Sequence, residues 1–132
     1  MIEQAHKRVP NARFLVLDFY DLKFADNSFD GFWSAASFLH VSKKEVSKVI
    51  NEAFRVIVAG GIGFISVKEK TEFDEGLIAQ EKLGISRYFA FYTEDEFKKI
   101  LLKLGLKVLE VTRVIENDDR KTVWLCFFVL RQ

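Results

Sequence analysis

Apolar residues recur along two stretches of the chain at three- and four-residue steps, the spacing of one helix face. The first set comprises Val46, Val49, Ile50, Ala53, Phe54 and Ile57. The second set comprises Phe97, Ile100, Leu101 and Leu104. Each set follows a capping-box pattern, Ser42–Glu45 and Thr93–Glu96, in which a hydroxyl and a glutamate three residues later satisfy each other's backbone N–H groups. We therefore expect helices beginning at Ser42 and Thr93, ended by Gly60–Gly61 and by Gly105.

Continuous apolar and aromatic runs without helical spacing predict buried strands. These runs are residues 13–17, 29–35, 62–67, 106–115 and 122–130. A short helix over residues 2–8 is expected before the first run, and Asp26–Asn27 lie in an expected loop. The polar segment 116–121 joins the last two strands, which predicts an antiparallel hairpin. Alternating strands and helices predict an α/β fold with a mostly parallel, mixed sheet that ends in this hairpin.

Length and composition limit the class of protein. The 132 residues suffice for one core, so we expect a single domain over residues 1–132. Twenty basic and 19 acidic residues leave a net charge of +1, which gives no strong nucleic-acid signal. One cysteine and two histidines offer no metal-site spacing, and no apolar run reaches the ~20 residues of a membrane span. A cytoplasmic, metal-free protein is expected.

Several short motifs follow one another in a specific order. Asp18-Phe-Tyr-Asp-Leu22 is followed by Asp26-Asn-Ser-Phe-Asp-Gly31, and then by Phe38-Leu-His-Val41. Asn51-Glu-Ala-Phe-Arg-Val56 and Ala59-Gly-Gly61 come next. This series resembles the class I S-adenosylmethionine-dependent methyltransferases. The resemblance implies a Rossmann-like methyltransferase fold, S-adenosylmethionine as cofactor, and methyl transfer to a small molecule, an accessible nucleobase or a protein side chain.

The similarity begins after the family's first strand, its glycine-rich loop and the acidic end of its second strand. The resemblance therefore predicts a domain truncated at its N-terminus, with unpaired strand edges beside residues 13–17 and 29–34. Unpartnered buried backbone groups cost ~1–3 kcal/mol each, so we expect a rearrangement. Residues 13–17 pair directly with residues 29–34, or two chains form a homodimer, or a partner chain supplies the missing strands.

The resemblance also implies site residues at the ends of two strands. Asp18 matches the family's acid that accepts from the adenine amino group, and Phe19 matches its neighbour, whose backbone N–H reaches the ring. Ser34, Ala35 and Ala36 match the small residues that let the methionine part of the cofactor approach. Each has an ordinary structural explanation as well, namely a loop-capping aspartate and small residues that pack at a strand end.

His40 is the candidate catalytic residue, as a general base or substrate contact just beyond the second of these strand ends. A structural role, with the ring bonded to nearby backbone, is an open alternative. The aromatic run Arg87–Tyr92 either lines a substrate pocket or anchors the following helix, and the anchor is favoured. Lys43, Lys44, Lys98 and Lys99 are expected on solvated helix faces.

Two functions from different classes follow. The first is a methyltransferase whose cofactor site is completed by a partner or a second copy. The second is a non-catalytic oligomerisation or regulatory fragment that keeps the fold without cofactor binding. A nicotinamide-dependent oxidoreductase has little support, because no tyrosine is followed four residues later by lysine.

Overall fold

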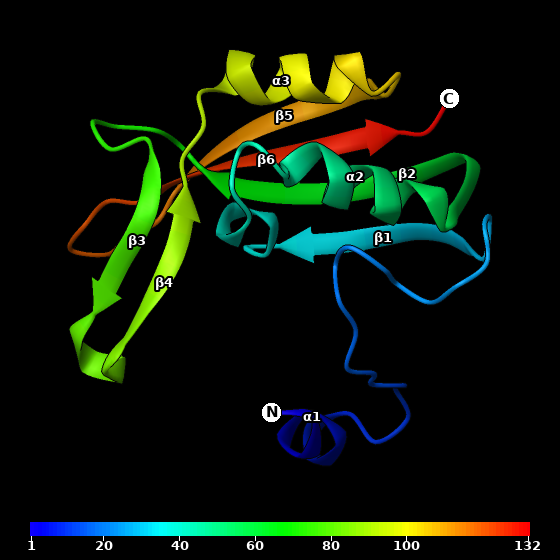
Figure 1. Cartoon of the computed structure of the whole chain (residues 1–132), viewed down its shortest axis with the longest axis horizontal. Helices are drawn as coiled ribbons and strands as arrows, with labels where there is room; N and C mark the ends of the chain where they lie inside the picture. The colour runs from blue at the N-terminus through cyan, green and yellow to red at the C-terminus, as the bar shows by residue number, and fades with distance from the viewer.

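A computed structural model describes all 132 residues. Its centre is a four-stranded sheet in the order β1-β2-β6-β5, beside a two-stranded hairpin, β3–β4 (Figure 1). The strands are β1 (Phe29–Ala35), β2 (Ile57–Lys68), β3 (Glu75–Gln80), β4 (Ile85–Ala90), β5 (Lys107–Ile115) and β6 (Val123–Leu130). The helices are α1 (Ile2–Arg8), η1 (Phe38–His40), α2 (Val46–Arg55), η2 (Glu81–Leu83) and α3 (Glu94–Lys103).

The expected α/β architecture and the terminal hairpin are confirmed, but the proportion of parallel pairs differs. Only β1 and β2 run parallel, whereas β2–β6 and β5–β6 are antiparallel. The expectation of a mostly parallel sheet depended on residues 13–17 forming another strand. The sheet is mixed as expected, but mostly antiparallel, because that run does not join it.

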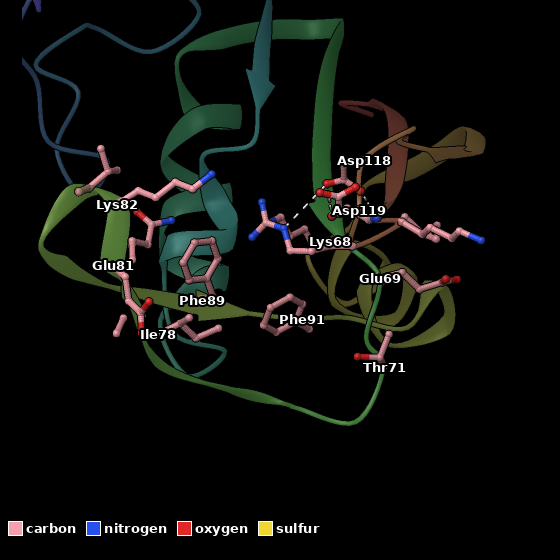
Figure 2. Close-up of a pocket in the computed structure, with 17 residues that line it drawn as sticks. Lys68, Glu69, Thr71, Ile78, Glu81, Lys82, Phe89, Phe91, Asp118 and Asp119 are labelled. Carbon is pink, nitrogen blue, oxygen red and sulfur yellow. Dashed lines mark hydrogen bonds and ion pairs between the residues drawn. The ribbon is translucent and has the colours of Figure 1, made fainter.

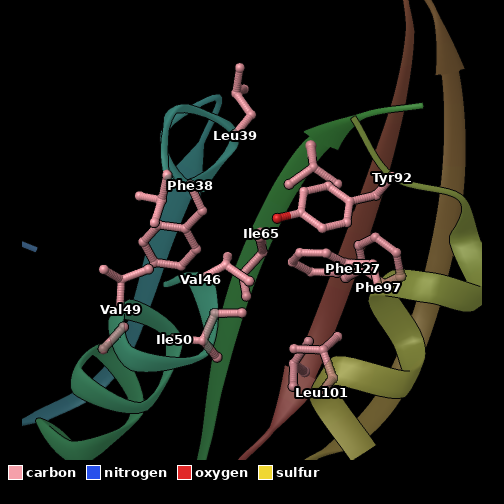
Figure 3. Close-up of a cluster of buried hydrophobic side chains, with 14 of the residues drawn as sticks. Phe38, Leu39, Val46, Val49, Ile50, Ile65, Tyr92, Phe97, Leu101 and Phe127 are labelled. Atoms are coloured by element: carbon pink, nitrogen blue, oxygen red, sulfur yellow. The ribbon is translucent and has the colours of Figure 1, made fainter. Parts of the chain in front are cut away.

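One face of the sheet is covered by α2 and α3, and the core lies between them and the strands (Figure 3). Ile65 and Phe127 are register partners on this face, and both are fully buried. Phe97 of α3 packs on Phe127 with ring centroids 4.9 Å apart, and Ile50 of α2 is equally buried. The two helices therefore bury their apolar stripes on one shared surface, as their spacing predicts.

The opposite face of the sheet presents an aromatic row. Trp33, Phe64 and Phe128 are register partners on three neighbouring strands. The Trp33 and Phe64 rings stack at 3.7 Å, and those of Phe64 and Phe128 lie 5.2 Å apart. Trp33 is nevertheless 69% exposed. This face is apolar and carries no covering helix within the chain (Figure 1).

The predicted strand at Arg13–Leu17 is wrong. The segment has no regular structure and makes no backbone–backbone hydrogen bond. Leu15, Val16 and Leu17 are 51%, 87% and 39% exposed. The predicted pairing with residues 29–34 is also wrong, since β1 pairs only with β2. A strand needs a neighbour for its backbone groups, and none lies beside this run.

The helix beginning at Thr93 is confirmed together with its capping box. The Glu96 N–H donates to Thr93 Oγ1 at 3.1 Å, and the Thr93 N–H donates to the Glu96 carboxylate at 3.3 Å. Gly105 follows with φ +76°, a conformation that glycine adopts without steric cost. Local sequence alone therefore determines both ends of α3.

The other capping box does not form. Helix α2 begins at Val46 after a turn in which the Val46 N–H donates to the Ser42 carbonyl, and Glu45 pairs with Lys48. Helix α2 ends at Arg55, not at the glycines. Gly60, at φ +84°, lies within β2, in the segment where the register with β1 shifts. The glycines thus form a bulge in a strand.

Lys43 holds three segments together and does not lie on a solvated face as predicted. Its side chain is only 14% exposed, and Nζ contacts Asp74 at 2.6 Å and Glu96 at 2.7 Å. Its backbone N–H donates to Glu75 at 2.9 Å. Asp74, Glu75 and Glu96 lie more than 30 positions after Lys43 in the sequence. The local sequence pattern around Lys43 therefore did not predict this network.

None of the helices is long and apolar enough to cross a membrane.

Candidate functional site

The candidate site lies at one edge of the sheet. Because β1 and β2 are parallel, their carboxyl ends, Ala35 and Lys68, meet at this edge. Lys68 also pairs with Trp124 at the start of β6, which brings the β5–β6 loop to the same edge. Open α/β sheets bind ligands outside the carboxyl ends of their parallel strands. The topology therefore gathers three loops where a ligand is expected.

Residues Ser34, Ala35 and Ala36 form the end of β1. Ser34 is buried, and its hydroxyl has no hydrogen-bond partner. The Ala36 N–H donates to Ser66 Oγ at 3.0 Å, and Ala36 has φ +55°, which costs a residue with a Cβ about 1–2 kcal/mol. Ala35 and Ala36 are exposed. A strained turn and two small, exposed side chains leave room for a ligand to approach this backbone.

His40 lies next to this turn, at the end of η1. Its Nδ1 is 2.9 Å from the Tyr88 carbonyl oxygen, and its ring packs edge-on against Phe89 at 4.7 Å. A carbonyl oxygen only accepts, so Nδ1 carries the proton and Nε2 of the neutral ring is an acceptor. The backbone bond is the predicted structural alternative, and it also fixes the tautomer that a general base needs.

Asp18 and Phe19 approach the site to different degrees. Phe19 packs edge-on against Phe38 of η1 at 5.6 Å, so it lies beside the segment that follows β1. Asp18 Oδ1 accepts from the Tyr20 N–H at 2.8 Å, the loop-capping arrangement foreseen as its structural alternative. The structure thus places Phe19 beside the segment that holds His40, while the Asp18 carboxylate bonds within its own loop.

A cleft of about 1050 Å³ opens at the same edge, between the β3–β4 hairpin and the β5–β6 loop (Figure 2). Its walls include Phe89 and Phe91, whose rings lie 6.2 Å apart at 20°. Within the run Arg87–Tyr92, the favoured anchor role is confirmed for Tyr92, while a substrate-pocket role for Phe89 and Phe91 stays a prediction. Phe89 and Phe91 line the cleft, and the fully buried Tyr92 anchors α3 through Phe97 at 4.9 Å.

Lys68 is the cleft residue that sequence reasoning missed. Its Nζ lies 4.9 Å from the Phe89 ring centroid and 5.4 Å from that of Trp124. Burial lowers the pKa of its ammonium group, and the charge of Arg120 adds to this, against the opposing effect of Glu116 and Asp118. The sequence feature that could have indicated Lys68 is its position at the end of an apolar strand. Parallel sheets bind ligands at the carboxyl ends of their strands.

The described residues contain no group of three or more His, Cys, Asp or Glu side chains placed to hold a metal ion.

The chain resembles known proteins both in sequence family and in fold. The family model described as "Methyltransferase domain" matches residues 1–65. No curated protein sequence matches the chain significantly.

Solved structures match almost the whole chain. One is the Burkholderia thailandensis 1,6-didemethyltoxoflavin-N1-methyltransferase with bound 1,6-didemethyltoxoflavin and S-adenosylhomocysteine. It has TM-score 0.79 and 17% identity, with 99% of this chain and 56% of that chain covered. Another is a SAM-dependent methyltransferase from Methanosarcina mazei, with TM-score 0.78 and 20% identity, covering 92% of this chain and 68% of that one. This is the fold of the class I S-adenosylmethionine-dependent methyltransferases.

The fold and the match over residues 1–65 confirm the methyltransferase family resemblance and its Rossmann-like architecture. This chain spans only 56% of the length of the Burkholderia methyltransferase. It spans 60% of the length of a third matching structure, the cyclase SpnF. The cyclase has TM-score 0.72 and 17% identity to this chain. One fold therefore carries proteins described by different reactions, so function must be argued from the site.

Proposed function

We propose that this chain takes part in S-adenosylmethionine-dependent methyl transfer and binds the cofactor at the carboxyl end of β1. The observation that carries the proposal is the turn at the end of β1, where Ala36 has φ +55° and where Ala35 and Ala36 are small and exposed. A strained backbone at the carboxyl end of a parallel strand is typical of a ligand site. The bound cofactor supplies an electrophilic methyl group on a sulfonium.

The remaining site residues take the roles that the family resemblance implies. Phe19, beside Phe38, contacts the adenine ring, and Asp18 accepts from its amino group after releasing the Tyr20 N–H. His40 takes the proton that the methyl acceptor loses, at Nε2, because Nδ1 is already committed to the Tyr88 carbonyl. Alignment and exclusion of water supply most of the acceleration in such a transfer. His40 is therefore an aid to the reaction more than a requirement.

Titration with S-adenosylhomocysteine by calorimetry tests the cofactor site. We expect micromolar binding that Ala35→Phe weakens at least ~10-fold, since a bulky side chain at the turn excludes the ligand. Ala59→Phe is the matched control, because Ala59 is also exposed but lies near the opposite, amino end of β2. Absence of binding at millimolar ligand overturns the proposal.

We also propose that the site is completed in a homodimer. The Arg13–Leu17 run of one copy has unpaired backbone groups and exposed apolar side chains, and β1 of the other copy has an unpaired edge. If the Arg13–Leu17 run of one copy pairs with the β1 edge of the other, the backbone groups of both segments gain hydrogen-bond partners. Light scattering should give a dimer that Val16→Lys dissociates. A monomer with this edge unprotected from hydrogen exchange contradicts the dimer and leaves a partner chain as the source of the missing strand.

The alternative is a non-catalytic oligomerisation or regulatory role. It is favoured by one sequence observation: the only Gly-x-Gly, Gly61–Gly63, lies inside β2, not in a loop after a strand. Such a protein would dimerise as above, yet fail to bind S-adenosylhomocysteine. The two measurements together therefore separate the alternatives.

A further inference from the structure

The cleft beside β3 and β4 combines a flat apolar wall with basic side chains (Figure 2). Phe91 and Ile78, both half-buried, supply the accessible apolar surface, while Phe89 lines the cleft but is buried. The basic lining residues are Lys68, Lys82, Arg120 and Lys121. Acidic residues line the cleft as well, so the charge available to a ligand depends on which of these groups are already paired.

The acidic groups nearest the cleft are largely engaged by other partners. Arg113 binds both oxygens of Glu69, at 2.9 and 2.8 Å. Asp118 accepts from the N–H and the hydroxyl of Thr122, at 3.1 and 3.3 Å, and lies 3.9 Å from Arg120. Glu81 and Asp119 are exposed. None of these carboxylates neutralises a lysine of the cleft.

Lys68 differs from the other lysines of the cleft, which are exposed. It is half-buried at the end of β2, and no carboxylate lies within 4.0 Å of its Nζ. Two aromatic rings, Phe89 and Trp124, are the groups that face the ammonium. Such contacts hold a cation in place without cancelling its charge. A half-buried ammonium without a counter-ion beside an open cleft is suited to an anionic group.

We propose that this cleft binds a planar small molecule bearing an anionic group, a carboxylate or a phosphate. The anion pairs with the Lys68 ammonium, and the flat body of the molecule lies on the half-buried Phe91 and Ile78. An ion pair at a partly desolvated lysine is stronger than one at an exposed lysine.

The cleft is connected to the proposed reaction site through Phe89. The Phe89 ring contacts His40 at 4.7 Å and Lys68 at 4.9 Å. The buried Phe89 therefore links Lys68 of the cleft to the proposed proton acceptor. The assignment of this planar anion as the methyl acceptor rests on the proposed function. Its binding to the cleft does not depend on the cofactor.

The experiment compares 2-naphthoate with its neutral analogue 2-naphthamide, each titrated into the 132-residue chain without cofactor. We expect saturable binding of the naphthoate at least ~10-fold tighter than that of the amide. The indole N–H resonance of Trp124, which donates to Glu116 at 3.0 Å, should shift on binding. The resonance of Trp33, on the uncovered sheet face, should not. Equal affinity for the two probes, or a shift at Trp33 alone, overturns the proposal.

Substitution of Lys68 provides the second arm. Lys68→Gln should weaken naphthoate binding at least ~10-fold and change amide binding less than ~2-fold, whereas Lys68→Arg keeps the charge and most of the affinity. Lys99→Gln is the matched control, since Lys99 is exposed and forms no ion pair. Undiminished naphthoate binding by Lys68→Gln overturns the assignment. Binding of S-adenosylhomocysteine is measured separately, so failure of either proposal leaves the other standing.

Discussion

Residues 1–28 and residues 29–132 both contain apolar runs, but only the second region buries them. Val16 in the Arg13–Leu17 run is 87% exposed, whereas Leu125, Phe127 and Val129 in β6 are fully buried. Both runs read as strands. The difference is that β6 has β2 and β5 as neighbours and α3 above it, while Arg13–Leu17 has no strand beside it. Apolar sequence therefore forms a strand only where pairing partners exist.

Polar contacts join the two regions, in addition to the packing of Leu22 and Phe24 against the core. Glu52 accepts from the Leu22 N–H at 2.9 Å, and Arg55 donates to the Phe24 carbonyl at 2.8 Å. Asn27 and Ser28 continue this contact by donating from their backbone to the end of α2, at 3.1 and 2.8 Å. Residues 19–28 are thus attached to the packed region, while residues 1–18 extend away from it (Figure 1).

The largest expected difference between the regions is in the cost of removing an apolar side chain. Phe97→Ala should lower the free energy of unfolding by about 3–5 kcal/mol, because it leaves a cavity against Phe127 and Tyr92. At protein concentrations where the chain is monomeric, Val16→Ala should change it by less than about 0.5 kcal/mol, because Val16 is 87% exposed there. Urea unfolding followed by circular dichroism measures both. Similar losses for the two variants would mean that Arg13–Leu17 is packed in solution.

A smaller effect is expected at Lys43, which joins the start of α2 to the β3–β4 hairpin and α3. Lys43→Met should cost about 2 kcal/mol, since Asp74 and Glu96 lose a charged donor in a largely covered position. Lys99→Met removes the same charge from an exposed position and should be close to neutral. Equal unfolding midpoints of these two variants would show that the network contributes no stability.

The smallest effect concerns the attachment of residues 19–28 and depends on pH. Hydrogen bonds from Arg55 and from the Leu22 N–H lower the pKa of Glu52 to about 2. Because the folded-state pKa lies below the unfolded value, the contact is fully present above about pH 4.5 and is lost as the pH falls towards 2. The amide chemical shift of Leu22 should follow this transition. Glu52→Gln should remove most of it, and a midpoint near 4.5 in the unchanged chain would contradict the contact.

Local sequence predicted the elements whose determinants are close together in the chain. The Thr93 capping box and Gly105 determine α3 because the groups that satisfy its ends lie within a few residues of it. The same reasoning failed at Ser42, where Glu75, Asp74 and Glu96 draw Lys43 into a distant network. Lys43 lies between Ser42 and Glu45, so its long-range contacts replace the local arrangement that the motif predicts.

The candidate site was predicted in part for the same reason. Ser34, Ala35, Ala36 and His40 lie in one stretch of sequence at a strand end, and the structure keeps them together. Lys68 joins them only because β2 is parallel to β1, and Phe89 only because the hairpin folds back over His40. These contacts require pairing between residues that are 20 to 50 positions apart, which no spacing rule shows.

The sequence by itself determined the helix periods, the apolar strands of the sheet, the terminal hairpin and the family resemblance, because each depends on residue order over short distances. Tertiary structure alone decided which apolar runs became strands, since backbone groups must find partners across the sheet. It also decided that Lys68 faces a cleft and Lys43 an ion network. Both outcomes depend on which distant side chains meet each lysine, and the fold alone sets this.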